Sequence, residues 1–141
     1  MAGKTPPGLF GLLHAAGSAE SHVESRLSTV GLSLPKLAAL HHLVSAGDSL
    51  PLGQLAERLS CVKSNVTQLV DRLEIDGLVS RAPDPNDRRS RLAVITDTGR
   101  KSYARGMKLQ QEAEQELFGV LTPDELAQLA HIIGKLDRHL T

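Results

Sequence analysis

The chain has 141 residues, 40% hydrophobic and 23% charged, which excludes a disordered protein and fits one domain with its own core. Sixteen basic and sixteen acidic side chains give a formal net charge of zero, which argues against a strongly basic, non-specific nucleic-acid binder but not against a specific one. The single Cys61 excludes an internal disulfide or a thiolate zinc cage, and two Phe and one Tyr are too few to stack single-stranded bases.

Two helices are predicted first. One spans about residues 8–30, and its glycines weaken it, so it requires packing from outside, including from another chain. Gly31 ends it, and Ser33 is the expected cap of a helix that runs to about Ser45. The apolar spacing of this second helix predicts a set of inward positions: Leu34, Leu37, Ala38, Leu40, His41 and Val44.

A helix-turn-helix pattern follows. Residues 52–59 have the spacing of a two-turn amphipathic helix, and a break is expected at Ser60 and Cys61. A second helix is predicted from about Lys63 to Glu74, closed by Gly77. One face of it is apolar, and the opposite face carries polar side chains: Lys63, Ser64, Asn65, Thr67, Gln68, Asp71 and Arg72.

A β-hairpin is predicted next, from strands at 78–82 and 91–95, with Ser49–Pro51 as a minor third strand. Arginines cluster at the loop and its exit: Arg81, Arg88, Arg89 and Arg91. We expect Asp87 to orient this wing by an ion pair with Arg89 or Arg91.

Two helices end the chain. Thr96 is expected to cap the first, from Asp97 to about Val120, and Thr122-Pro123-Asp124-Glu125 is a capping-box start for the last. The last helix carries more apolar side chains than a small winged domain can bury: Leu126, Leu129, Ile132, Ile133, Leu136 and Leu140. A homodimer is the simplest use of this surplus.

The predicted fold is therefore mainly α with a small β-hairpin wing. A winged helix-turn-helix of about 34–96 is flanked by N- and C-terminal dimerisation helices of about 8–30 and 97–141.

This layout is typical of DNA-reading proteins. Asn and Gln side chains pair with adenine, Lys63 and Arg72 can reach phosphate or guanine, and Arg88, Arg89 and Arg91 suit a narrow minor groove. The polar face of the second helix does not by itself distinguish a DNA-reading helix from an ordinary solvated one. The arginine-rich hairpin is the feature that favours DNA binding.

The segments Leu73–Arg81 and Asp87–Thr96 resemble the signature of MarR-type transcriptional regulators, with L-x-x-x-G-L-V-x-R followed by D-x-R and I-T. The resemblance covers nearly the whole chain and implies a single MarR-like domain over residues 1–141. It implies a homodimer on a double-stranded DNA operator, with Ser64, Asn65, Thr67 and Gln68 on the operator and Arg89 at the wing tip. Val62 departs from the family, which often has a polar cap there. The recognition helix must then use Ser60 or Ser64, or start later.

Family members commonly lose DNA affinity when a small phenolic or aromatic acid binds beside the dimerisation helices. The residues available for such an effector pocket are His14, His22, His41 and His42, with Tyr103 and Arg105. For each histidine taken alone, ordinary packing or exposure is favoured over a role in ligand binding. Zinc sensing through Glu24, His41 and His42 lacks further ligands in the long helix, so we expect no metal and no other cofactor.

The expected function is a homodimeric repressor of a pseudo-palindromic operator, released by such a ligand. One alternative is a redox-responsive regulator acting through Cys61, whose pKa a helix N-terminus would lower. Another is a winged helix used for protein contact without DNA. The sequence has no glycine-rich phosphate loop and no nucleophile elbow, so an enzyme is not expected. It also lacks a membrane span and a secretory signal, which predicts a cytoplasmic protein without a membrane partner.

Overall fold

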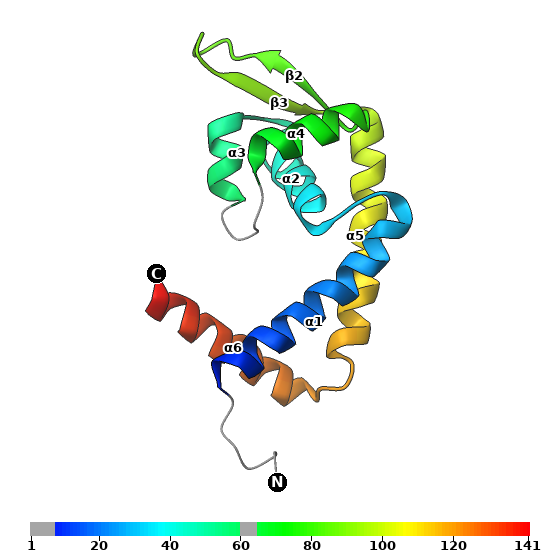
Figure 1. Cartoon of the computed structure of the whole chain (residues 1–141), viewed down its shortest axis with the longest axis vertical. Helices are drawn as coiled ribbons and strands as arrows, with labels where there is room; N and C mark the ends of the chain where they lie inside the picture. Colours follow the sequence, from blue (N-terminus) through cyan, green and yellow to red (C-terminus); the bar gives the residue numbers. More distant parts are fainter. Residues whose placement is uncertain (1–7, 60–64) are drawn as a thin grey trace.

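The computed structural model describes residues 8–59 and 65–141. The break predicted at Ser60 and Cys61 and the predicted start of the next helix at 62–64 lie outside these residues. The described chain is mostly helical with one small antiparallel sheet (Figure 1), which confirms the predicted fold class.

The N-terminal helices begin and end at the predicted signals. Helix α1 (Leu9–Leu27) continues into a short 3₁₀ turn, η2 (Ser28–Val30), and Gly31 follows with a left-handed φ of 74°. Helix α2 (Leu34–Ser45) is capped by Ser33, whose hydroxyl accepts a hydrogen bond from Lys36 N at 3.3 Å.

The central region is a winged helix-turn-helix. Helices α3 (Leu52–Arg58) and α4 (Val66–Ile75) are followed by strands β2 (Val79–Pro83) and β3 (Arg91–Ile95). Strand β1 (Ser49–Pro51) pairs antiparallel with β3, so the sheet order is β1-β3-β2 and the predicted third strand is confirmed.

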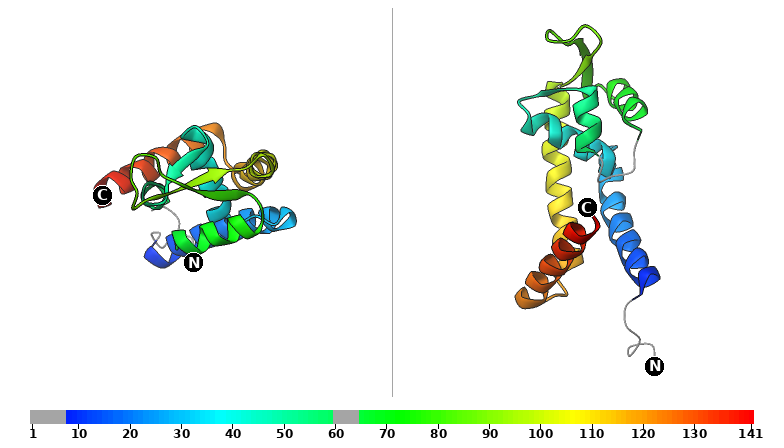
Figure 2. Two further views of the ribbon diagram at one scale, coloured as in Figure 1. Left: turned by 90° about the horizontal axis from the view of Figure 1, so that it is seen from above. Right: turned by 90° about the vertical axis from the view of Figure 1, so that its left-hand side faces the viewer.

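The two C-terminal helices also start as predicted. The Thr96 hydroxyl accepts a hydrogen bond from Gly99 N at 2.9 Å and caps α5 (Asp97–Phe118). Thr122 and Glu125 form the capping box of α6 (Pro123–Leu140). Helix α5 runs from the sheet to the far end of the molecule and packs along α1, and α6 starts at that end and runs back, so that the C-terminus lies nearer the wing than the start of α6 does (Figures 1 and 2).

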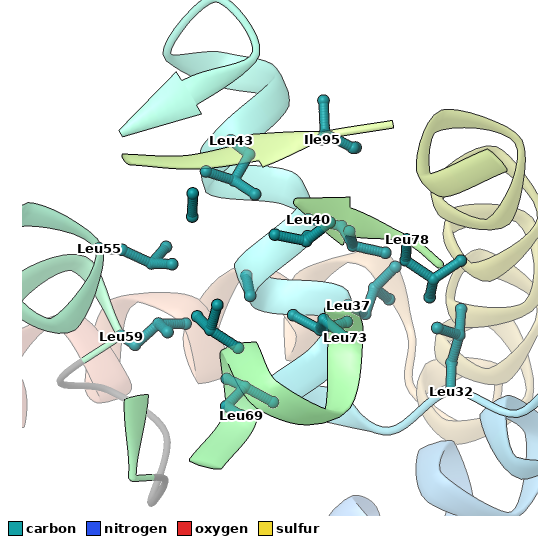
Figure 3. Close-up of a cluster of buried hydrophobic side chains, with 14 of the residues drawn as sticks. Leu32, Leu37, Leu40, Leu43, Leu55, Leu59, Leu69, Leu73, Leu78 and Ile95 are labelled. Atoms are coloured by element: carbon teal, nitrogen blue, oxygen red, sulfur yellow. The ribbon is translucent and has the colours of Figure 1, made fainter. Parts of the chain in front are cut away.

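The core lies between α2, α3, α4 and the sheet, and leucines dominate it (Figure 3). Because α3, α4 and the sheet all pack on α2, the buried positions of α2 are Leu37, Ala39, Leu40 and Leu43. The predicted inward set was therefore partly wrong, since His41 is exposed and the buried Ala39 and Leu43 are missing from it. Leu34, Ala38 and Val44 are half-buried and pack against the core, as predicted.

Candidate nucleic-acid interface

The recognition helix α4 starts later than predicted. It begins at Val66 rather than near Lys63, because the Asn65 side chain caps it: Asn65 Oδ1 accepts hydrogen bonds from Thr67 N at 3.1 Å and from Gln68 N at 3.2 Å. Of the alternatives that followed from Val62, the later start is the one found. Lys63 and Ser64, both predicted DNA contacts, lie outside the described residues.

This cap changes what Asn65 can offer to DNA. A bidentate pair with adenine requires both the oxygen and the nitrogen of a carboxamide, and the Asn65 oxygen is already occupied. Gln68 is exposed, and its carboxamide makes no hydrogen bond to any described residue. Gln68 is therefore the better candidate for reading a base.

The outer face of α4 is hydrophilic because its inner face is used for packing. Leu69, Val70 and Leu73 are buried against the core, which turns Thr67, Gln68, Asp71 and Arg72 to solvent. An open groove of about 550 Å³ runs along this face. Its lining residues are Lys36, Gln68, Asp71, Arg72, Ile75 and Asp76.

The wing tip between β2 and β3 is ordered by its own aspartates. Asp84 Oδ1 accepts a hydrogen bond from Asn86 N, and Asp87 Oδ1 accepts one from Arg89 N, each at 2.9 Å. The side chains of Arg88, Arg89 and Arg91 are exposed on this tip.

The ion pair predicted for Asp87 is wrong. Among the described residues its carboxylate pairs with no arginine, because it is turned back onto the backbone amide of Arg89. Asp87 thus shapes the loop from which Arg89 projects, and the Arg89 guanidinium makes no ion pair with any described residue.

Arg81 lies at the base of the wing and not at its tip. Its guanidinium is 2.6 Å from Asp71 Oδ1 and 2.8 Å from Glu74 Oε1, both on α4. Arg81 therefore does not belong with the tip arginines as predicted, because short spacing in the chain does not reveal which face of a strand a side chain takes.

The predicted effector residues separate into two places. His41 and His42 line a mostly apolar pocket of about 300 Å³ between α2 and α5, whose other lining residues are Leu34, Leu37, Ala38, Met107 and Gln110. Tyr103 adjoins it, with its hydroxyl 2.9 Å from His41 Nδ1. Burial, followed by the charges of His41 and Arg58, lowers the pKa of His42, so this imidazole is neutral at neutral pH.

His14, His22 and Arg105 are not among the residues that line this pocket. His14 and Arg105 are exposed, and His22 Nε2 lies 3.0 Å from Glu116 Oε2 at the α1–α5 contact. The sequence analysis missed Met107 and Gln110. The spacing of Tyr103, Met107 and Gln110 by four and three residues was the available signal, since it puts them on one side of α5.

Zinc binding finds no support in the geometry. A side-chain oxygen of Glu24 accepts a hydrogen bond from the backbone N–H of Leu34 and so helps to cap α2. Over residues 8–59 and 65–141, no group of three or more His, Cys, Asp or Glu side chains is placed to hold a metal ion.

Comparison with known proteins gives the family. A model described as MarR family matches residues 30–90. The multiple antibiotic resistance protein MarR of Salmonella typhimurium is 31% identical over 111 residues, covering 78% of this chain and 76% of the relative. The chain belongs to the MarR family. Its members are transcription regulators rather than enzymes, and the winged helix is their DNA-binding unit.

Two further relatives are informative. The transcriptional repressor MdtR of Bacillus subtilis is 32% identical, with 75% of this chain and 68% of the relative covered. The crystal structure of the C80S mutant of Escherichia coli MarR, complexed with operator DNA, has a TM-score of 0.80 at 27% identity and covers 91% of this chain and 92% of that one. No helix in the described part of this MarR-family chain is long and apolar enough to cross a membrane.

Proposed function

We propose that the protein is a homodimeric repressor of a pseudo-palindromic operator, released by a small phenolic or aromatic acid. The observation that carries the DNA-binding part is the pairing of an exposed polar face on α4 with an exposed, arginine-tipped wing on the same rigid unit. The relative named as a repressor and the family structure with operator DNA support the same role.

In this proposal each α4 enters a major groove, where Thr67, Gln68 and Arg72 contact bases or phosphates. Each wing lies in a flanking minor groove, where Arg88, Arg89 and Arg91 meet the strongest negative potential. Two-fold symmetry requires half-sites about 34–36 Å apart, one helical turn of DNA. Selection of bound duplexes from a random pool would identify the operator, and a failure to enrich any sequence would contradict the proposal.

The proposed dimer is supported by apolar side chains of α1 and α6 that the single chain leaves exposed. On α1 these are Leu9, Phe10, Leu12 and Leu13, and on α6 they are Leu126, Ile132, Ile133, Leu136 and Leu140. A second copy would bury both sets at once.

Arg89→Ala is expected to weaken operator binding by roughly tenfold to hundredfold, the equivalent of about 1–3 kcal/mol. The physical reason is the loss of a guanidinium that has no other partner among the described residues. Fluorescence anisotropy on the selected duplex would measure the change. Arg138→Ala, which removes an exposed arginine from α6 and leaves α4 and the wing unchanged, is the matched control and should bind as the wild type does. Equal affinity of the two variants would remove the wing from the DNA interface.

The pocket between α2 and α5 is the proposed site of the releasing acid. Its apolar wall suits an aromatic ring, and its two histidines suit a carboxylate or phenol. We expect 2-hydroxybenzoate to lower operator affinity by roughly fivefold or more, within the usual range of allosteric coupling. Cyclohexanecarboxylate, a non-aromatic acid of similar size, should have less effect.

Ala38→Leu, which adds carbon atoms inside this pocket, is expected to keep operator affinity and to lose the response to 2-hydroxybenzoate. An undiminished response would place the acid elsewhere. The alternative of redox control through Cys61 gains no support from the structure, because this residue lies outside the described ranges.

A further inference from the structure

Arg81 joins the wing to the recognition helix at several points. Its Nη1 donates to Glu74 Oε1 at 2.8 Å, and its Nη2 donates to Asp71 Oδ1 at 2.6 Å and reaches Thr67 O at 3.5 Å. Its backbone N–H donates to Glu74 Oε2 at 3.2 Å. One residue of β2 therefore contacts three residues of α4.

The three partners form one stripe along α4. Thr67, Asp71 and Glu74 are spaced by four and three residues, which puts them on the same side of the helix, facing β2. The Arg81 side chain is only 19% exposed, whereas those of Asp71 and Glu74 are 53% and 43% exposed. The arginine in this contact is thus better shielded from solvent than the arginine of an ordinary surface ion pair.

A guanidinium is required for this arrangement. Its planar fork reaches two carboxylates at once, whereas a lysine ammonium at the same position is a single point charge. The hydrogen bond that Arg81 donates to Asp71 and the two nearby negative charges raise the pKa of Arg81, so it stays charged at any physiological pH.

The connection extends to the wing tip. Arg81 pairs with Ala93 in the β2–β3 ladder, which continues to the pair Pro83 and Arg91. Beyond the ladder, the hydrogen bond of Asp87 to Arg89 N orders the tip. The distance from the α4 face to the tip arginines is therefore set by backbone pairing plus the Arg81 contacts.

We propose that Arg81 is a positioning residue for operator recognition: without touching DNA, it holds the wing at a fixed place relative to α4, so that the wing arginines and the α4 side chains engage one operator together. This inference rests on the proposed function, in which both α4 and the wing contact DNA. It also means that Asp71 and Glu74, two carboxylates on the DNA-reading helix, share one positive charge from the wing strand, which offsets half of their combined negative charge.

The test compares two duplexes that carry the operator selected by the wild-type protein. The long duplex includes the flanking base pairs that the wings would contact, and the short duplex ends at the half-sites. The affinity ratio of long to short duplex measures what the wing contributes. For the wild type we expect a ratio of roughly ten or more, and for Arg89→Ala a ratio near one.

Arg81→Met is expected to bind the short duplex within about threefold of the wild type and to lose most of the long-to-short ratio. Arg81→Lys should recover only part of the ratio, because the fork is missing. Thermal melts followed by circular dichroism would verify that both variants are folded. A purely structural role of Arg81 would weaken binding to both duplexes by the same factor, and that result would overturn the proposal.

Asp71→Asn provides a second route if Arg81→Met does not fold. It keeps the shape of the side chain and weakens the charge-assisted bond to Arg81. Loss of a negative charge should raise affinity for both duplexes, so a lowered ratio is the diagnostic result, and an unchanged ratio contradicts the inference. A wild-type ratio near one would instead contradict the proposed wing contact, together with the role of Arg81 that depends on it.

Discussion

Replacement of Ile133 by glutamate is expected to turn the protein into a monomer and to remove its high affinity for operator DNA. Ile133 is 54% exposed in the single chain, and it lies on a stripe of α6 with leucines at 126, 129, 136 and 140. These positions alternate by three and four residues, the spacing of a helix seam that packs against another helix. A charge placed on the seam would be buried by the partner.

The size of the effect follows from symmetry. In a two-fold dimer each substitution occurs twice, and an unpaired buried charge costs about 3–5 kcal/mol. We therefore expect the dissociation constant of the dimer to rise by at least about a hundredfold, and operator affinity to fall with it because each half-site would be bound alone.

Analytical ultracentrifugation would measure the mass, and anisotropy the DNA affinity. Ala127→Glu introduces the same charge at an exposed position on the side of α6 away from this stripe and should leave both unchanged. A dimeric Ile133→Glu variant with normal operator binding would show that the exposed face of α6 has another use.

Among the described residues, α6 contributes no side chain to the buried core of its own chain. Its capping box and its Pro123 start favour a helix, but an 18-residue helix without packing is marginal in water. Within the described residues α6 buries none of its side chains. A partner is therefore the expected source of its stability.

Gly99→Ala is expected to lower the free energy of unfolding by about 3 kcal/mol. A Cβ atom at residue 99 would lie 2.1 Å from the carbonyl oxygen of Leu78 and 2.8 Å from Ile95 Cγ1. The same Leu78 oxygen accepts a hydrogen bond from Thr96 N at 3.0 Å, so the start of α5 would have to move away from Leu78 and break this bond. The helix that joins the DNA-binding unit to the far end of the molecule would then be misplaced.

Urea unfolding at one fixed protein concentration would measure the change, because dimer stability depends on concentration. Gly53→Ala is the matched control: Gly53 lies in α3 of the same region, and nothing is within 4 Å of a Cβ placed there. It should be neutral or stabilise by up to about 1 kcal/mol, as expected for glycine in a helix. Similar losses in both variants would mean that helix propensity, and not the close approach at Gly99, decides stability.

Local signals account for most of what could be predicted. Ser33, Thr96 and Thr122 cap their helices as expected, and Gly31 and Gly77 have the left-handed φ values of 74° and 76°. These features depend on hydrogen bonds and backbone angles within a few residues, so a single sequence carries them in full.

The errors at the interface have a different origin. The predicted start of α4 near Lys63 was wrong, because Asn65 supplies the cap and the helix begins at Val66. Asp87 was assigned to an arginine side chain, although an aspartate in a turn readily accepts a hydrogen bond from a backbone amide two residues on. In both cases two local hydrogen-bonding arrangements were possible, and residue spacing alone does not show which of them forms.

The sequence by itself determined the order of helices and strands, most of their caps, the arginine-rich wing and its MarR-family signature, because each of these depends on residues close together in the chain. Only the tertiary structure decided that Arg81 faces α4 and not DNA, that His41 and His42 share a pocket from which His14 and His22 are absent, and that Gly99 touches Leu78. Some of these contacts join residues distant in the chain, and others depend on a side-chain direction that residue spacing does not determine. They form only when α4, α5 and the sheet pack together.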